Sequence, residues 1–185
     1  MSYQRDYHGS DPVIVFWYLR EDLFNEVNLL SLYRAKNIVQ SAGNEAGKTM
    51  VDEYALSEDE RDAFYIFAKK AIYDAFAQVV KMTKALTDTV FINDGVYTGE
   101  ESTSGIVTSS PAYGFILYDN TAYNANVLQL VDNEILKFLR MEILYDWYDL
   151  NGMDAEASKY KAKWDESRRD LVNRYLFQLR KPLIS

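Results

Sequence analysis

The sequence feature that most constrains the fold is a pair of apolar patterns between about residues 120 and 181. Both follow the helical period: Val127, Val131, Ile135, Phe138, Leu139, Leu144, Trp147 and Tyr148 recur in the first, and Met153, Ala157, Tyr160, Trp164, Leu171, Tyr175 and Leu179 in the second. Arg168 interrupts the second pattern. The two patterns predict two long amphipathic helices joined by a short connection.

The connection between these helices is a turn from Leu150 to Asp154. Gly152 can take the left-handed conformation that ends a helix, and Asp154 suits the N-cap of the next helix. A turn this short forces the helices to lie antiparallel, which allows the two tryptophans to lie close together across the seam. We therefore expect the hairpin to pack through Trp147, Gly152, Tyr160 and Trp164.

Two further helices are predicted before this hairpin, after a polar and loose segment of residues 1–10. The apolar run from Val13 is rich enough in β-branched and aromatic residues to form a strand, but Leu19, Leu23, Val27 and Leu30 continue it at helical spacing. With Asp11-Pro12 as its start, we predict a helix over about 12–41. A capping box at Ser57-Glu58-Asp59-Glu60 then opens a helix that should run to about Thr87. Its expected buried face comprises Phe64, Phe67, Ala68, Ala71, Ala75, Val79 and Met82.

The region from about 88 to 120 differs in composition from the helices. Residues 89–97 and 113–118 are rich in strand formers, and Asp94-Gly95 favours a tight hairpin turn. Residues 99–110 are mostly Gly, Ser, Thr and Glu, which predicts a mobile loop. The predicted fold is mainly α: a helical bundle with a long antiparallel C-terminal helix hairpin and a β-hairpin and loop excursion between helices. We expect one domain over residues 1–185, with its helical core over about 12–87 and 121–181.

Composition excludes several classes of protein. An apolar content of 48% in 185 residues is enough for a sizeable core. The absence of Cys removes disulfides and thiolate chemistry, and favours an intracellular origin. The longest apolar run, residues 13–19, is too short to cross a bilayer. A net charge of −8 argues against non-specific binding to nucleic acid or anionic membranes.

No residue pattern predicts catalysis. Residues 43–49 resemble a phosphate-binding loop but have three residues between the glycines where four are needed, and no buried strand precedes them. The single histidine, His8, has no nucleophile or metal-ligand cluster near it in the sequence. Two sets of carboxylates are candidates for a site. A metal site could use Glu134, Glu142 and Asp146. A glycosidase-like pair could come from Asp88, Asp94, Glu100, Glu101 and Asp119. Neither has the required pattern, so we expect no catalytic group, cofactor or metal.

Charge is distributed unevenly along the chain. Residues 85–136 contain no Lys or Arg, the connection before residue 62 is acidic, and the last predicted helix is rich in cations. These charges either form solvated helix faces or pair a basic surface of one copy with an acidic surface of the next. Direct contact with DNA is a weaker alternative, because the cations do not form one stripe.

The segment 135–154, followed by 157–174, resembles the closing hairpin of the head–tail connector proteins of tailed bacteriophages, also called adaptor or neck-ring proteins. The residues that carry the likeness are Tyr145, Trp147, Gly152, Tyr160, Trp164 and Arg180-Lys181-Pro182. It covers about a third of the chain and consists of helix patterns rather than a strict motif. The first half matches in architecture only.

This resemblance implies a structural virion protein at the head–tail junction, not an enzyme. Such proteins form rings, usually of twelve copies, that bind the portal and a downstream neck or tail protein while DNA passes through the lumen without sequence-specific contact. The expected contacts with the portal or a neighbouring subunit are Lys161, Lys163, Arg168, Arg169, Arg180 and Lys181. Glu100, Glu101, Ser102, Thr103 and Ser104 would form a second contact or line the lumen. The alternatives are a helical interaction or regulatory module, or a small ligand-binding helical protein.

Overall fold

The computed structural model describes residues 3–8, 10–41, 51, 54–80, 85–93, 111–119 and 125–176. Its elements, in chain order, are strands β1 (Tyr3–His8) and β2 (Asp11–Leu19), helix α1 (Arg20–Ser41), the 3-10 helix η1 (Glu58–Glu60), helix α3 (Arg61–Val80), strands β3 (Ala85–Asn93) and β4 (Ala112–Tyr118), helices α4 (Ala125–Leu150) and α5 (Asp154–Asp170), and the π-helical segment η2 (Leu171–Leu176). The protein is mainly helical with a small antiparallel sheet, as the sequence predicts.

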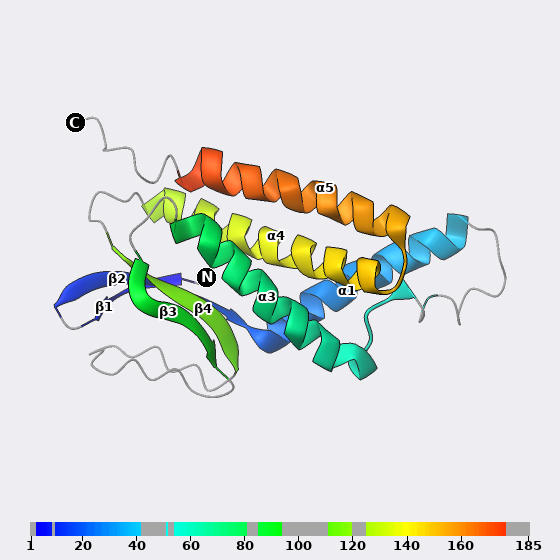
Figure 1. Ribbon diagram of the computed structural model, residues 1–185, viewed down its shortest axis with the longest axis horizontal. Coiled ribbons are helices and arrows are strands. Elements are labelled where there is room, and N and C mark those ends of the chain that lie inside the picture. Colours follow the sequence, from blue (N-terminus) through cyan, green and yellow to red (C-terminus); the bar gives the residue numbers. More distant parts are fainter. Residues whose placement is uncertain are drawn as a thin grey trace.

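The sheet lies at one end of an elongated molecule, and the helices extend away from it (Figure 1). Helix α5 runs along one long side, and the end of α1 reaches beyond the turn between α4 and α5. The predicted capping box at the start of α3 is present, with the Glu60 carboxylate accepting a hydrogen bond from the Ser57 N–H at 2.7 Å. None of the described helices is long and apolar enough to span a lipid bilayer.

The sheet has four antiparallel strands in the order β1-β2-β4-β3. The predicted strand segments are confirmed in part, because residues 89–93 belong to β3 and residues 113–118 to β4; the two strands pair with each other, with Asn93 opposite Ala112. The Asp94-Gly95 turn and the 99–110 loop lie outside the described residues. Strand β3 begins at Ala85, so the prediction that the preceding helix continues to Thr87 is wrong, and α3 ends at Val80.

The prediction of a helix over 12–41 is wrong in its first third. Residues 11–19 form β2, which lies between β1 and β4 in the sheet, and the helix begins only at Arg20. Residues 3–8, expected to be loose, form β1. The reason is tertiary: β2 pairs with β1 and β4 along its edges, and both of its faces are buried, with Ile14 and Phe16 in the main core and Val13 and Val15 in a smaller cluster. The β-branched and aromatic content of this run therefore outweighs its helical spacing.

The predicted helix hairpin is present as α4 and α5. At the end of α4, Gly152 has a φ of 66°, its N–H donates to the Asp149 carbonyl at 3.1 Å, and the Met153 N–H donates to the Tyr148 carbonyl at 2.9 Å. These two bonds form the Schellman motif, so the role predicted for Gly152 is confirmed. The N-cap of α5 is Met153 rather than Asp154. Asp154 instead lies in the first turn, where its charge favours the helix dipole.

One cluster of buried residues joins the sheet to all of the long helices. It includes the predicted buried face of α3 from Phe64 to Val79 except for Phe67, which is half-buried and packs against the cluster. Met82 lies outside the described residues. Phe16 links this cluster to the sheet, with its ring 5.9 Å from that of Tyr3 and 5.4 Å from that of Phe115.

We expect Phe16→Ala to destabilise the protein by about 3–5 kcal/mol, because it removes a ring that is 1% exposed and leaves a cavity between β2 and the helices. Ile66→Ala is the control, because Ile66 is 68% exposed on α3 and its truncation should cost less than about 0.5 kcal/mol. Urea unfolding followed by circular dichroism measures both. Equal effects of the two substitutions would contradict the place of β2 in the core.

Candidate functional site

The residues predicted to pack the hairpin lie at the seam between α4 and α5, but in different pairs from those expected. Tyr148 stacks on Tyr160, with ring centroids 5.3 Å apart. Trp164 contacts Phe138 and Tyr145, at 5.7 Å and 6.5 Å, and not Trp147. Trp147 is only 2% exposed and belongs to the main core. Helical geometry explains the difference, because Trp147 is two residues from Tyr145 and so points to another side of α4.

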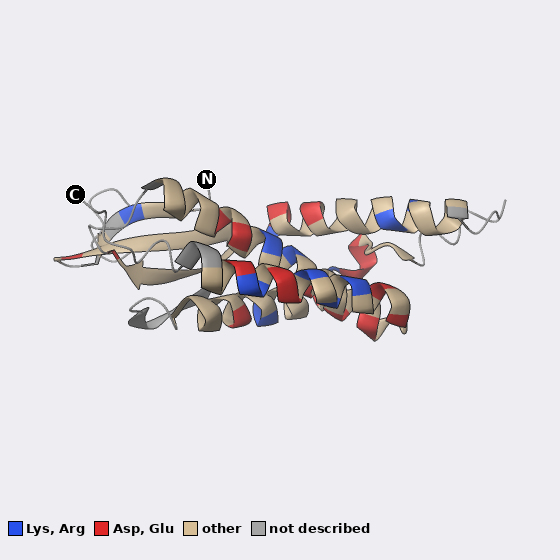
Figure 2. Ribbon diagram, turned by 90° about the horizontal axis from the view of Figure 1, so that it is seen from above, with Lys and Arg blue, Asp and Glu red and all other residues tan. Residues whose placement is uncertain are grey.

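The predicted cations of α5 are exposed, but they do not form one surface. Lys161 lies over the Tyr145 ring at 5.4 Å, and Lys163 lies over the Tyr160 ring at 4.8 Å. Positions two apart on an α-helix differ by about 200°, so these lysines flank α5 on opposite sides. Charges of both signs occur along the described helices, and none of these helices carries a continuous basic stripe (Figure 2).

The remaining predicted cations divide in the same way. Arg168 lies on the Lys161 side, over the Trp164 ring at 5.3 Å, and pairs with Asp165 at 3.3 Å. Arg169 donates to the carbonyl of Asp165 at 3.3 Å. Arg180, Lys181 and the loop residues Glu100, Glu101, Ser102, Thr103 and Ser104 lie outside the described residues. The structure therefore brings together only part of the predicted contact surface.

A cationic hollow lies where α1 meets α5. Its volume is about 410 Å³, and it is lined by Arg34, Glu156, Lys159, Tyr160, Ala162 and Lys163. The Arg34 guanidinium donates two hydrogen bonds of 2.5 Å to the Glu156 carboxylate, and Lys159 lies 2.6 Å from the same carboxylate. The hydrogen bond from Arg34 lowers the pKa of Glu156.

The charges of the hollow do not balance. Three cations, Arg34, Lys159 and Lys163, stand against the single carboxylate of Glu156. Next to them, burial raises the pKa of the Tyr148 hydroxyl, which has no hydrogen-bond partner among the described residues. Sequence reasoning missed the pairing of Arg34 with Glu156, because the two residues are 122 positions apart and no local pattern indicates that they meet.

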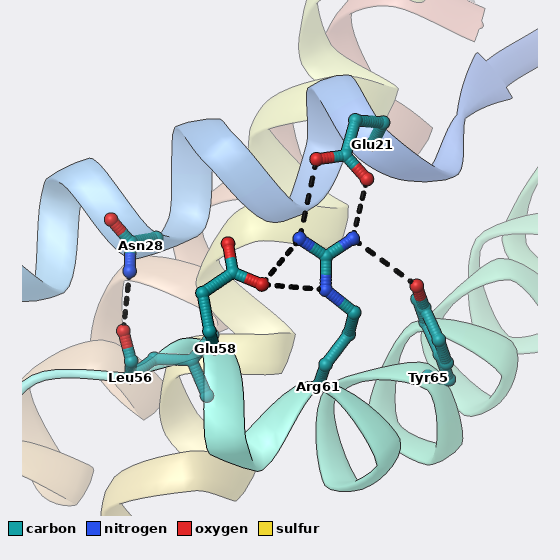
Figure 3. Close-up of polar contacts among 6 residues, drawn as sticks. All are labelled: Glu21, Asn28, Leu56, Glu58, Arg61 and Tyr65. Carbon is teal, nitrogen blue, oxygen red and sulfur yellow. Dashed lines mark hydrogen bonds and ion pairs between the residues drawn. The ribbon is translucent and has the colours of Figure 1, made fainter.

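An acidic corner lies where α1 and α3 begin. It consists of Glu21, Asp22, Glu58, Asp59 and Asp62. Arg61 lies between Glu21 and Glu58 and contacts both (Figure 3). The Arg61 guanidinium lies 2.5 Å from Glu21 and 2.6 Å from Glu58, and its cation faces the Phe24 ring. These contacts raise the pKa of Arg61 and lower that of Glu21. The remaining acids of the corner, Asp22, Asp59 and Asp62, are exposed.

The acidic corner is held rigidly to α1. The Asn28 amide donates to the Leu56 carbonyl at 2.5 Å, a contact drawn in Figure 3. The Leu56 N–H donates in turn to the Ser31 hydroxyl at 3.0 Å. Both bonds join the segment before η1 to the middle of α1, which attaches the start of α3 to α1.

The carboxylates considered for a metal site serve as internal partners. Glu134 accepts a hydrogen bond of 2.6 Å from the Ser167 hydroxyl, while Lys70 lies 3.2 Å from Glu142 and 2.8 Å from Asp146. Within the described ranges, no three His, Cys, Asp or Glu side chains gather as metal ligands would. Burial and the neighbouring Asp74 raise the pKa of Glu142 to about 8.

Three other sequence candidates give no site in the described ranges. Residues 43–49 lie outside them, as do Asp94, Glu100 and Glu101. The side chains of His8 and Asp88 lie outside them too, although their backbones belong to β1 and β3. Asp119 is paired with Arg5 at 3.0 Å, which ties β1 to the residue that follows β4.

Comparison of the chain with protein-family models, with curated proteins and with solved structures gives no match.

Glu142 should make stability depend on pH. The pKa of Glu142 is about 8 in the folded protein, whereas its usual value is 4.5. At a pH between these two values, Glu142 keeps its proton in the folded protein and has lost it in the unfolded chain. This contribution therefore lowers stability as pH rises from about 4.5 to about 8. Glu142→Gln cannot titrate, so its free energy of unfolding should decline less over this range, by on the order of 1–3 kcal/mol.

Urea unfolding at several pH values measures this slope for the wild type and Glu142→Gln. Asp59→Asn, an exposed change in the acidic corner, is the control and should keep the slope of the wild type. Parallel curves for Glu142→Gln and the wild type would mean that Glu142 does not retain its proton in the folded protein.

Proposed function

We propose that this chain is a structural component of the head–tail junction of a tailed bacteriophage. In this proposal it is a connector-type helical bundle that forms a ring between the portal and a downstream neck or tail protein. DNA passes through the lumen without sequence-specific contact, and the protein resides in the virion. The role requires no catalytic group and no cofactor.

The observation that carries this proposal is that two helices expose large apolar side chains that no described residue covers. Leu29 and Tyr33 of α1 are 52% and 60% exposed, and Ile66 and Tyr73 of α3 are 68% and 48% exposed. Spacings of four and seven residues put each pair on one side of its helix. Grouped exposed apolar side chains are typical of surfaces that other protein chains cover.

The shape of the molecule and the resemblance of its closing hairpin support the same proposal. Helix α1 extends beyond the α4–α5 turn, so it offers a long side to a neighbouring subunit (Figure 1). Lys161, Lys163, Arg168 and Arg169 remain the proposed contacts with the portal or a neighbour among the described residues. Outside the described residues, Arg180 and Lys181 are further proposed contacts with the portal or a neighbour, and residues 100–104 are the proposed second contact or lumen lining.

The native mass of the purified protein, alone and mixed with a portal protein, tests this proposal. We expect a ring near twelve copies, visible by negative-stain microscopy and by mass photometry. A chain that stays monomeric alone and does not join the portal would contradict it. That result would favour a helical interaction module or a small ligand-binding protein.

A second test concerns the exposed side of α1. Leu29→Glu with Tyr33→Glu should prevent assembly while leaving the circular dichroism spectrum unchanged, because both side chains are largely exposed in the single chain. Leu130→Glu is the control, because it makes the same change at an apolar position of α4 that is 43% exposed and lies outside the proposed contacts. If the double variant assembles as the wild type does, this side of α1 is not part of the ring.

A further inference from the structure

The cationic hollow and the acidic corner lie on different sides of the same chain. Helix α5 borders the hollow along one long side of the molecule, whereas the starts of α1 and α3 lie on the opposite side (Figure 1). The two surfaces therefore cannot neutralise each other within one molecule. Two different surfaces that meet between copies give a head-to-tail contact, which forms a ring where the rotation between neighbours closes and an open chain where it does not.

The hollow has the chemistry to receive carboxylates. Lys163 is exposed over the Tyr160 ring and has no carboxylate partner among the described residues, so its charge is available to an incoming acid. Arg34 and Lys159 add to the positive potential, although Glu156 already pairs with both.

The acidic corner has the complementary chemistry. Asp59 and Asp62 are exposed and form no ion pair among the described residues, whereas Glu21 and Glu58 are occupied by Arg61. Asp59 and Asp62 are three positions apart across the start of α3, so their carboxylates lie on the same side. The contacts of Asn28 and Ser31 with Leu56 fix this segment on α1, so little ordering is needed on binding.

We propose that the cationic hollow of one copy receives the acidic corner of the next, with Lys163 facing Asp59 and Asp62. This contact rests on the proposed ring and names the surfaces that join its subunits. Because the chain carries a net charge of −8, copies repel one another on average, and the hollow gives a local attraction that sets their orientation.

The chain offers a matched pair of variants for the test. Lys161 and Lys163 are both exposed on α5, and both lie over a tyrosine ring, but only Lys163 lines the hollow. Analytical ultracentrifugation of the full chain at low salt measures the association constant. Lys163→Glu should weaken association by about tenfold or more. Lys161 lies on the other side of α5, where it is a proposed contact with the portal and not with the neighbouring copy, so without a portal Lys161→Glu should change self-association by less than roughly threefold.

Charge exchange makes the test specific. Asp59→Lys with Asp62→Lys should weaken association as Lys163→Glu does. The chain that carries all three changes should recover association, because opposite charges face each other again. Loss of folding is checked by the melting temperature, which Lys163→Glu should leave nearly constant. The two aspartate replacements should lower it by a few degrees at most, because both acids lie in a first helical turn, where they favour the helix dipole. Equal behaviour of Lys161→Glu and Lys163→Glu, or no recovery in the triple variant, would overturn the contact.

The same measurements separate this contact from the proposed function. Rings that form and are insensitive to these charge reversals would overturn the contact and leave the connector proposal standing. Charge-sensitive association into dimers or open chains that never join a portal would support the contact and contradict the connector proposal. A wild-type chain that stays monomeric at the highest attainable concentration would overturn the contact.

Discussion

The burial of α4 is the constraint on which the rest of the structure depends. This helix packs against α1, α3, α5 and η2, so most of its sides face protein rather than water. Three of its carboxylates are buried: Asp132, Glu134 and Glu142. A buried charge without a partner is costly, so each of these positions requires a polar group from a neighbouring element.

Each buried carboxylate of α4 has a partner from a different element. The Tyr18 hydroxyl of β2 donates to Asp132 at 3.2 Å, the Ser167 hydroxyl of α5 donates to Glu134, and Lys70 of α3 lies beside Glu142. Burial and the Asp132 carboxylate raise the pKa of Tyr18, which keeps its hydroxyl protonated as the donor. A polar contact within an apolar core thus fixes the position of each of β2, α5 and α3 relative to α4.

The separation between inner and outer charges bears on function. The buried carboxylates of α4 have polar partners within the chain, whereas Lys163, Asp59 and Asp62 at the surface have no ionic partner among the described residues. The helix that carries Lys163 is held by the stack of Tyr148 on Tyr160, and Asp59 and Asp62 are held by the start of α3. Rigid surfaces of this kind suit contact between folded subunits, because little conformational entropy is lost on binding.

The sequence by itself determined those features that depend on neighbouring residues. The hairpin of α4 and α5, the left-handed Gly152, the capping box at Ser57 and the buried face of α3 all arise from local spacing and turn chemistry. Only the tertiary structure decided that residues 11–19 form a strand, because their pairing with β4 involves residues about 100 positions away. The same holds for the cationic hollow, since Arg34 and Glu156 meet only when α1 packs across the hairpin. Periodicity along one chain reports which side of a helix is apolar, but it carries no information about which distant side chain will lie against it.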